Sequence, residues 1–293
     1  VEGRFSKLFN YVSKVNASKA GPFDVVFAVG RFFGDPGAPS ELAAFLDGTE
    51  KAALPLYFIA GEEAAGTTGP IDGLEEGGEL CENITYLGRW GKQMLHGLSV
   101  CYLSGVYDAA KYSVLGNASS EGGASAAQFT PAYTEEHVEE LLIAADAYRQ
   151  DRGFDVLLTS EWGEGFDNLL AAEDQFTLSA KDRSKQLRRP PSAAVGRLGR
   201  ELSPRYHFAG GQYSSVQLPV YKNSCATTRF YGLGSTDTVK CKAFGIGVNK
   251  KAAVPGVPSP SEVAARATAS DNPYTSSRKV AVAYMNKGGA EGK

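Results

Sequence analysis

The chain has 293 residues, of which 43% are hydrophobic, and its formal net charge is −3 at pH 7. This length and composition allow the core of one large domain or two small ones. The negative charge excludes a surface that attracts nucleic acid over its whole area, so such contact would need a local basic patch. No apolar run is long enough to cross a membrane as a helix, and no membrane partner is expected.

The first part of the chain predicts helices alternating with buried strands. Apolar residues recur at helical spacing over about residues 3–15, which indicates an amphipathic helix. The runs "FDVVFAVG" at 23–30 and "LPLYFIAG" at 54–61 are bounded by turn residues and predict two buried strands, with a short helix over 39–46 between them. The acidic, glycine-rich segment 62–82 is typical of an exposed loop.

The middle of the chain predicts a strand pair, a helix and another strand. "NITYLG" and "LSVCYLSG" are expected to be strands on either side of the turn "RWGKQ". Thr134 is the expected N-cap of an amphipathic helix whose first turn carries Glu135 and Glu136, where the helix dipole favours negative charge. "FDVLLTS" at 154–160 repeats the pattern of the first strand. Nearly all-apolar strands that alternate with helices indicate a layered α/β domain.

The last third of the chain differs in pattern. "RYHFAGGQY", "CATTRFYGLG" and "VKCKAFGIGV" predict antiparallel or mixed strands of a second sheet. From about residue 249 the composition shifts to Ala, Pro, Ser, Lys and Gly, which is typical of a linker. We therefore predict a domain over residues 1–248 and a linker or tail over 249–293. Because the chain opens directly in a helical pattern, we also expect a first strand before Val1 and a further region after the tail.

Polar residues follow the predicted strands at their carboxyl ends, where open α/β folds place their sites. Arg31 follows the first strand, Glu62 and Glu63 follow the second, and Ser160 and Glu161 follow the strand at 154–160. These positions are expected to meet at one edge of the sheet.

The order of these elements resembles the calcineurin-like metallophosphoesterases, and most closely their lariat debranching enzyme branch. "YFIAGEE" stands where that family has a strand and Gly-Asn-His-Glu, and "FDVLLTSEW" stands where it has a strand ending in Ser-His-Asp-Trp. "PRYHFAGGQY" resembles the segment that carries the last pair of histidines. The resemblance implies a layered β-sandwich flanked by helices. In that family, His, Asp and Asn side chains at the strand ends hold two metal ions.

Nearly every metal ligand implied by this resemblance is replaced here. The positions of a histidine, the bridging aspartate, an asparagine, two further histidines and the last histidine pair are held by Glu2, Arg31, Glu62, Glu63, Ser160, Gly211 and Tyr213. An always-charged guanidinium cannot ligate a cation, so we expect Arg31 to pair with Glu62 or Glu63. We call these seven residues and Glu161 the vestigial pocket, and expect it to hold no metal, cofactor or catalytic residue.

A more specific resemblance is to the N-terminal domain of the CwfJ-type, debranching-enzyme-related proteins of the spliceosome. Seven words fall in the same order: "VEGRF", "FDVVFAVGRFFG", "CENITYLGRWG", "VCYLSGVY", "DVLLTSEW", "PRYHFAG" and "ATTRFYGLG". "DNPYTSSRK" looks like the peptide that follows this domain in the family. The resemblance implies a nuclear pre-mRNA splicing factor associated with post-catalytic intron-lariat spliceosomes and lariat turnover. Its expected partners are spliceosomal proteins, the debranching enzyme and intron RNA.

Basic residues gather in one stretch of the chain, which we call the basic strip. It could dock RNA backbone or an acidic protein surface, or be a flexible solvated insertion, as "RRPPS" suggests. Its members are Lys181, Arg183, Lys185, Arg188, Arg189, Arg197 and Arg200.

Two other functions stay open. The first is an active metal-dependent RNA phosphodiesterase with a site rebuilt from Glu2, Glu62, Glu63 and Glu161, because carboxylates suit Mg²⁺ and Mn²⁺. The second is a small-molecule-binding α/β domain, although no phosphate-binding loop is visible. His207 and Trp162 are interpreted as core residues.

Overall fold

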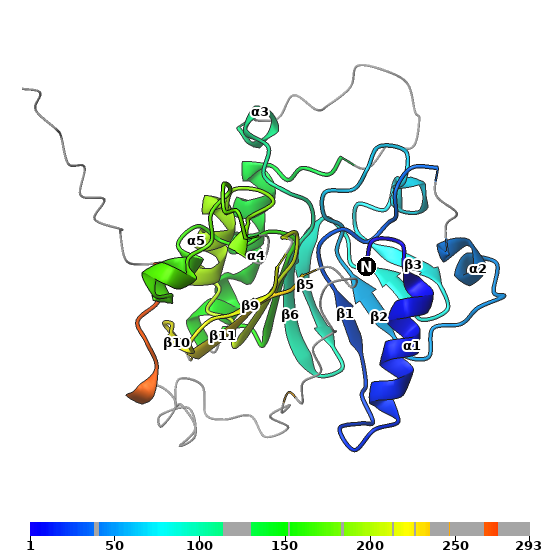
Figure 1. Cartoon of the computed structure of the whole chain (residues 1–293), viewed down its shortest axis with the longest axis horizontal. Coiled ribbons are helices and arrows are strands. Elements are labelled where there is room, and N and C mark those ends of the chain that lie inside the picture. The colour runs from blue at the N-terminus through cyan, green and yellow to red at the C-terminus, as the bar shows by residue number, and fades with distance from the viewer. Residues whose placement is uncertain are drawn as a thin grey trace, which may run out of the picture.

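The computed structural model describes residues 1–37, 41–113, 130–151, 153–182, 185–212, 214–225, 227–234, 246 and 267–274. Its strands form two mixed sheets, and helices flank both of them (Figure 1). This confirms the predicted mixed α/β class. Within the described residues, no helix has the length and apolar character needed to cross a membrane.

The first sheet has four strands in the order β1-β2-β4-β3. Strand β1 (Val26–Ala28) pairs in parallel with β2 (Leu56–Phe58), which pairs in parallel with β4 (Ile84–Tyr86). Strand β3 (Gly78–Cys81) runs antiparallel to β4 at the edge. The predicted loop over 62–82 therefore ends in a strand.

The second sheet has seven strands, with the path β10-β11-β8-β7-β6-β5 and β9 paired to β11. Strands β6, β7, β8 and β11 are parallel, and the remaining three are antiparallel to their neighbours. The strands are β5 (Trp90–Leu95), β6 (Leu98–Leu103), β7 (Val156–Thr159), β8 (Tyr206–Ala209), β9 (Val216–Gln217), β10 (Tyr221–Lys222) and β11 (Thr227–Gly232).

The hairpin of this sheet differs from the prediction. "RWGKQ" lies mostly in strand β5, and the turn is formed by His96 and Gly97, whose φ angles are 50° and 80°. Two consecutive positive φ angles fit a tight two-residue hairpin turn, which the sequence "LHGL" did not suggest.

Helices form the two outer layers. Helices α1 (Phe5–Asn16) and α2 (Leu42–Leu46) pack on the first sheet, and α4 (Glu135–Asp151) and α5 (Ala193–Glu201) pack on the second (Figure 1). The remaining helical turns are α3 (Ala109–Tyr112), η1 (Gly69–Ile71), η2 (Phe166–Leu169) and η3 (Ala172–Asp174). The helices predicted over 3–15 and after Thr134 are confirmed, whereas α5 lies in a region that had no predicted helix.

The alternation of strand β7 shows how these layers are joined. Val156 and Leu158 pack between the two sheets, whereas Leu157 packs towards α4 and α5. Successive residues of a strand point to opposite faces, so an all-apolar strand is buried on both. The core therefore lies in three layers, with the inter-sheet layer in the middle.

The region after residue 248 is described only over 267–274. Within the predicted tail, the backbone of Ser270 exchanges hydrogen bonds with the β10 region, and Tyr274 is 9% exposed. The predicted strand at "VKCKAFGIGV" lies outside the described residues apart from Ile246, and the domain limits at 248 and 249 stay a prediction.

Candidate functional site

The segments that follow strands β1, β2, β7 and β8 meet backbone to backbone. A Cβ on Gly61 would lie 2.6 Å from the carbonyl carbon of Gly30, and one on Gly210 would lie 2.6 Å from the Gly30 nitrogen. A Cβ on Gly211 would lie 2.3 Å from the carbonyl oxygen of Ser160. The strand ends therefore converge as the sequence predicted, and glycines let their backbones come close enough to touch.

Ser160 joins the two sheets at this point. Its side chain is buried, and its Oγ donates to the Ala60 carbonyl oxygen at 2.9 Å and accepts the Gly30 N–H at 3.2 Å. Because this hydroxyl donates to one backbone segment and accepts from another, it holds the two segments together. This residue stands where the resemblance implies a metal-binding histidine.

Glu63 holds the turn after β1. Its buried carboxylate accepts N–H groups from Phe32 at 2.8 Å, Phe33 at 3.0 Å and Gly61 at 3.1 Å. Burial raises the pKa of this carboxyl, and the three backbone hydrogen bonds oppose the rise. Both carboxylate oxygens of Glu63 thus accept hydrogen bonds from the protein's own backbone.

The expected pairing of Arg31 with Glu62 or Glu63 is wrong. Nη2 of Arg31 donates to the Gly34 carbonyl oxygen at 2.9 Å and to Asp35 Oδ1 at 2.8 Å. Asp35 lies in the same turn as Arg31, so this local partner is within reach without any contact between strand ends.

Glu161 has the most buried carboxylate of the described pocket, with 1% of the side chain exposed. Its Oε2 accepts the Tyr107 N–H at 2.8 Å and the Tyr133 hydroxyl at 2.7 Å, and its Oε1 lies 3.1 Å from Nε of Arg189. Burial raises its pKa, while Tyr133 and Arg189 act against that rise. Tyr133 also shares a 2.6 Å hydrogen bond with Ser192, which caps helix α5.

Two arginines of the basic strip belong to the pocket. Oε2 of Glu62 lies 3.3 Å from Nη2 of Arg188 and 3.7 Å from Nη1 of Arg189. The buried amide of Gln212 fixes both residues: its Oε1 accepts their N–H groups at 2.6 and 3.3 Å, and its Nε2 donates to the Arg189 carbonyl oxygen at 3.1 Å. Arg188 and Arg189 thus occupy the place beside Glu62 that was expected for Arg31.

The other described members of the basic strip lie apart from the pocket. Lys185 pairs with Asp174 at 3.2 Å, while Arg197 pairs with Glu139 of α4 and, at 2.9 Å, with Glu201 of its own helix. Arg200 lies 3.4 Å from Glu201. Lys181 is exposed, and Arg183 lies outside the described residues. The structure thus divides the strip, and its docking role stays a prediction.

The backbone N–H of Glu2 donates to the Arg31 carbonyl oxygen at 3.1 Å, so Glu2 lies beside the turn after β1. Tyr213 lies outside the described residues.

The donors present do not fit a two-metal centre. Among the described residues, no three His, Cys, Asp or Glu side chains gather closely enough to hold a metal ion. The two most buried carboxylates, Glu63 and Glu161, accept hydrogen bonds from the protein itself. A guanidinium beside Glu161 would repel a cation rather than bind it.

His207 and Trp162 are core residues, as predicted. The Thr159 hydroxyl donates to the Glu161 carbonyl oxygen at 2.8 Å, so its one remaining role at 2.9 Å from Nε2 of His207 is that of acceptor. Burial lowers the pKa of His207 to about 3, and the ring stays neutral. Trp162 is fully buried among aromatic rings.

Four residues shape the pocket although the sequence did not predict them as members of it. Tyr107 and Tyr133 come from the segments before α3 and α4, and Gln212 lies within the word "GGQY". Arg189 belongs to "RRPPS", a pattern that indicates a loop and gives no sign of burial. Only the position of Gln212, next to the expected strand end, could have pointed to the site.

Comparisons with known proteins identify homologues of this chain. It is 35% identical to the CWF19-like protein 1 homolog of Drosophila melanogaster over 234 residues, which cover 78% of this chain and 37% of that protein. It is 31% identical to CWF19-like protein 1 of Mus musculus, with 96% of this chain and 48% of that protein covered. It is 33% identical to the zinc finger CCCH domain-containing protein 64 of Arabidopsis thaliana, with 83% and 38% covered.

These relatives support the family resemblance only in part. The chain spans less than half of each of these three proteins, and no family model matches it. Homology to CWF19-like protein 1 is clear at this identity and coverage. None of these three names mentions a metallophosphoesterase-like domain.

Proposed function

We propose that this chain is a non-catalytic, phosphoesterase-like scaffold of a nuclear pre-mRNA splicing factor, associated with the post-catalytic intron-lariat spliceosome and lariat turnover. Homology to CWF19-like protein 1 supports the family, and the CwfJ-type words of the sequence support the splicing role. Its partners would be spliceosomal proteins, with the debranching enzyme and intron RNA as further candidates.

The fold supports the phosphoesterase-like part of this proposal. Two mixed sheets packed face to face, with helices on both outer faces, are what a calcineurin-like sandwich requires. The polar strand ends also meet at one place, as such a fold would arrange them.

The Arg189–Glu161 ion pair is the observation that carries the non-catalytic part. Glu161 follows strand β7, where the resemblance puts a catalytic metal site, and its carboxylate is closed off by a guanidinium, a tyrosine hydroxyl and a backbone N–H. Hydrolysis with two metal ions needs open coordination positions for water and phosphate. This arrangement offers a buried ion pair instead.

The experiment is a paired measurement of bound metal and of hydrolysis. Purified chain, incubated with Mn²⁺, Zn²⁺ or Fe²⁺ and then desalted, is expected to retain no stoichiometric metal by elemental analysis. It should also leave a 2′-5′ branched RNA intact under conditions in which an active debranching enzyme cleaves it. Two metal ions per chain, or cleavage of the branch, would overturn the proposal.

The alternative of a rebuilt carboxylate site makes the opposite prediction. It needs the carboxylates of Glu2, Glu62, Glu63 and Glu161 to face metal ions. Yet Glu63 binds the turn after β1 and Glu161 binds Arg189. If branched RNA were cleaved and Glu63→Gln abolished the cleavage, the alternative would replace the scaffold function.

A further inference from the structure

The position of Arg188 and Arg189 is built into the pocket by a buried side chain. Gln212 is 5% exposed and makes three hydrogen bonds to the backbone of these two residues. A buried amide is nearly always satisfied, and here its bonds fix two adjacent cations beside the converging strand ends. The pair is therefore part of a rigid site and not of a solvated loop.

The two arginines have two anionic partners of different character. Glu161 is 1% exposed and lies 3.1 Å from Arg189. Glu62 is 48% exposed and lies 3.3 Å from Arg188 and 3.7 Å from Arg189. Ion pairs with a half-exposed carboxylate are weak, since water competes for both charges. An external anion can thus replace Glu62 and leave the Glu161 pair in place.

Arg189 also has a donor to spare for such an anion. Its Nη1 is buried and makes no hydrogen bond within the described part of the chain. The Glu62 carboxylate at 3.7 Å is too distant to satisfy it. A phosphate oxygen that takes the place of Glu62 would supply the missing acceptor, and guanidinium groups match phosphate geometry well.

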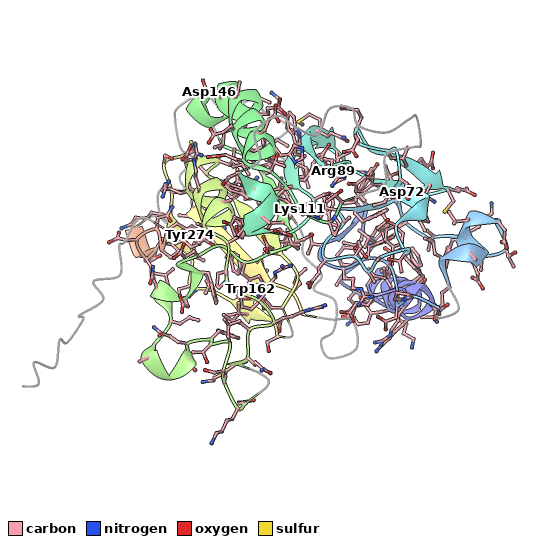
Figure 2. All side chains as sticks on the ribbon, turned by 90° about the horizontal axis from the view of Figure 1, so that it is seen from above. Asp72, Arg89, Lys111, Asp146, Trp162 and Tyr274 are labelled. Atoms are coloured by element: carbon pink, nitrogen blue, oxygen red, sulfur yellow. The ribbon has the colours of Figure 1, made fainter. Side chains whose placement is uncertain are left out.

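A half-exposed aromatic residue, Tyr107, shares the carboxylate partner of Arg189 through its backbone N–H. Tyr107 is 41% exposed, and its N–H donates to the same Glu161 carboxylate that binds Arg189. Its ring centre lies 5.0 Å from that of Tyr112 in helix α3. Lys111 of the same helix is exposed, and it lies on the face of the molecule that is turned to the viewer in Figure 2.

We propose that Arg188, Arg189 and Tyr107 form a binding site for single-stranded RNA, in which a backbone phosphate replaces Glu62 and a base stacks on the tyrosine ring. Guanidinium groups for the backbone and an exposed aromatic face for a base are the combination that holds single strands without sequence preference. An acidic peptide would use the arginines and leave the ring unused, so RNA is the ligand that fits all three residues. The proposal rests on the proposed function in one respect: the pocket holds the strand and does not cleave it.

The test is a fluorescence anisotropy titration of the purified chain into a labelled single-stranded RNA of about eight nucleotides, at two salt concentrations. Glu62→Gln is expected to tighten binding about threefold or more, because it removes the anion that competes with phosphate. Arg188→Gln should weaken binding about tenfold. Tyr107→Ala should weaken it by a similar factor, because stacking contributes about 1–3 kcal/mol per base and 1.4 kcal/mol is tenfold.

The matched controls are Arg197→Gln and Arg200→Gln, which lie in the same basic strip but on helix α5. Both should leave the affinity within twofold of the unmodified chain. Arg188→Gln and Glu62→Gln do not touch Glu161, and a melting curve for each confirms that the variant is folded. Tyr107→Phe should bind as the unmodified chain does, since it keeps the ring.

Several outcomes would overturn the proposal. Unchanged or weaker RNA binding by Glu62→Gln would show that phosphate does not replace Glu62. An equal loss of affinity in the Arg197→Gln control would show that the RNA binds through non-specific charge. A glutamate-rich peptide that displaces the RNA and binds Tyr107→Ala at full strength would identify an acidic protein as the ligand. Failure to bind RNA leaves the metal and branch-cleavage results untouched, whereas cleaved RNA on a denaturing gel overturns the scaffold function and not the binding site.

Discussion

Arg189 and Glu161 form an ion pair at the carboxyl end of strand β7, with Nε 3.1 Å from Oε1 and with 18% and 1% of the two side chains exposed. A charge pair at this depth is kept only when both partners are present, because either one alone would be buried without compensation. The pair therefore couples the segment after β7 to the segment that precedes α5.

Removing one partner of this pair should destabilise the domain strongly. Arg189→Gln leaves the Glu161 carboxylate buried without its guanidinium, and we expect the free energy of unfolding to fall by about 3 kcal/mol or more. Urea denaturation followed by circular dichroism measures the change. Adding Glu161→Gln to the same chain should restore part of the loss, and a purely additive double variant would contradict the coupling.

Arg197→Gln serves as the comparison for that experiment. Arg197 pairs with Glu139 and Glu201, and 36% of its side chain is exposed. Surface pairs of this kind contribute about 0–1 kcal/mol, so the control should lose far less stability than Arg189→Gln.

The burial of His207 makes part of the stability depend on pH. Burial lowers its pKa in the folded state to about 3 from the ordinary value of 6.5, so the folded state binds fewer protons than the unfolded state between these two pH values. The contribution of the neutral His207 ring to the free energy of unfolding is fully present above pH 6.5 and is lost as the pH falls towards 3. Between pH 7 and pH 5 this amounts to about 2 kcal/mol, at 1.36 kcal/mol per pH unit.

Urea denaturation at pH 7 and pH 5 tests this dependence. In His207→Gln the loss of stability between the two pH values should be smaller than in the unmodified chain by about 2 kcal/mol. His137→Gln should alter the pH dependence of stability less than His207→Gln does, because the His137 ring is only partly buried and its pKa is lowered less. An equal pH dependence in His207→Gln and the unmodified chain would show that His207 is not held neutral.

The backbone contact between strand ends should tolerate no side chain. A Cβ on Gly61 would lie 2.6 Å from the Gly30 carbonyl carbon, so Gly61→Ala forces two backbone segments apart. We expect a loss of about 2–3 kcal/mol in urea denaturation. Gly69→Ala is the matched control, because a Cβ there meets nothing within 4 Å, and it should be close to neutral.

The sequence predicted the parts of the fold that depend on local patterns. The apolar run that became β7 is buried on both faces, and the run that became β2 is buried on one face and half-buried on the other. Thr134 caps α4 because its hydroxyl accepts the His137 N–H at 3.3 Å. Helix α5 was missed because Gly196 and Gly199 lie inside it, and glycine is a poor helix former.

The site was predictable in its location but not in its pairing. Arg31 and Glu62 follow neighbouring parallel strands, so their proximity was a reasonable inference. Arg31 instead forms an ion pair with Asp35, four residues along the chain. Glu62 pairs with Arg188 and Arg189, whose backbone N–H groups are bound by Gln212. Such a pairing depends on a contact between two loops, and no periodicity or motif in either loop encodes it.

The segment 267–274 is expected to be a structural part of the domain. Tyr274 packs on helix α5 and on the segment after β7, where glycines leave room for its ring. A Cβ on Gly199 of α5 would lie 2.9 Å from its Cε2, and one on Gly163 would lie 3.1 Å from its Cε1. The adjacent Pro273 carbonyl oxygen accepts from Nδ2 of Asn168 at 2.8 Å. A large aromatic side chain held in this way contributes several kcal/mol when it is buried.

Tyr274→Ala should therefore lower the free energy of unfolding by about 3 kcal/mol and speed hydrogen exchange in α5. Gly199→Ala should produce the same exchange pattern, because the added methyl displaces the ring from the other side. Lys222→Gln, which removes a surface pair with Asp271 at 3.6 Å, is the control and should leave α5 protected. If Tyr274→Ala left both stability and α5 exchange unchanged, 267–274 would be a linker, as the composition of the tail suggested.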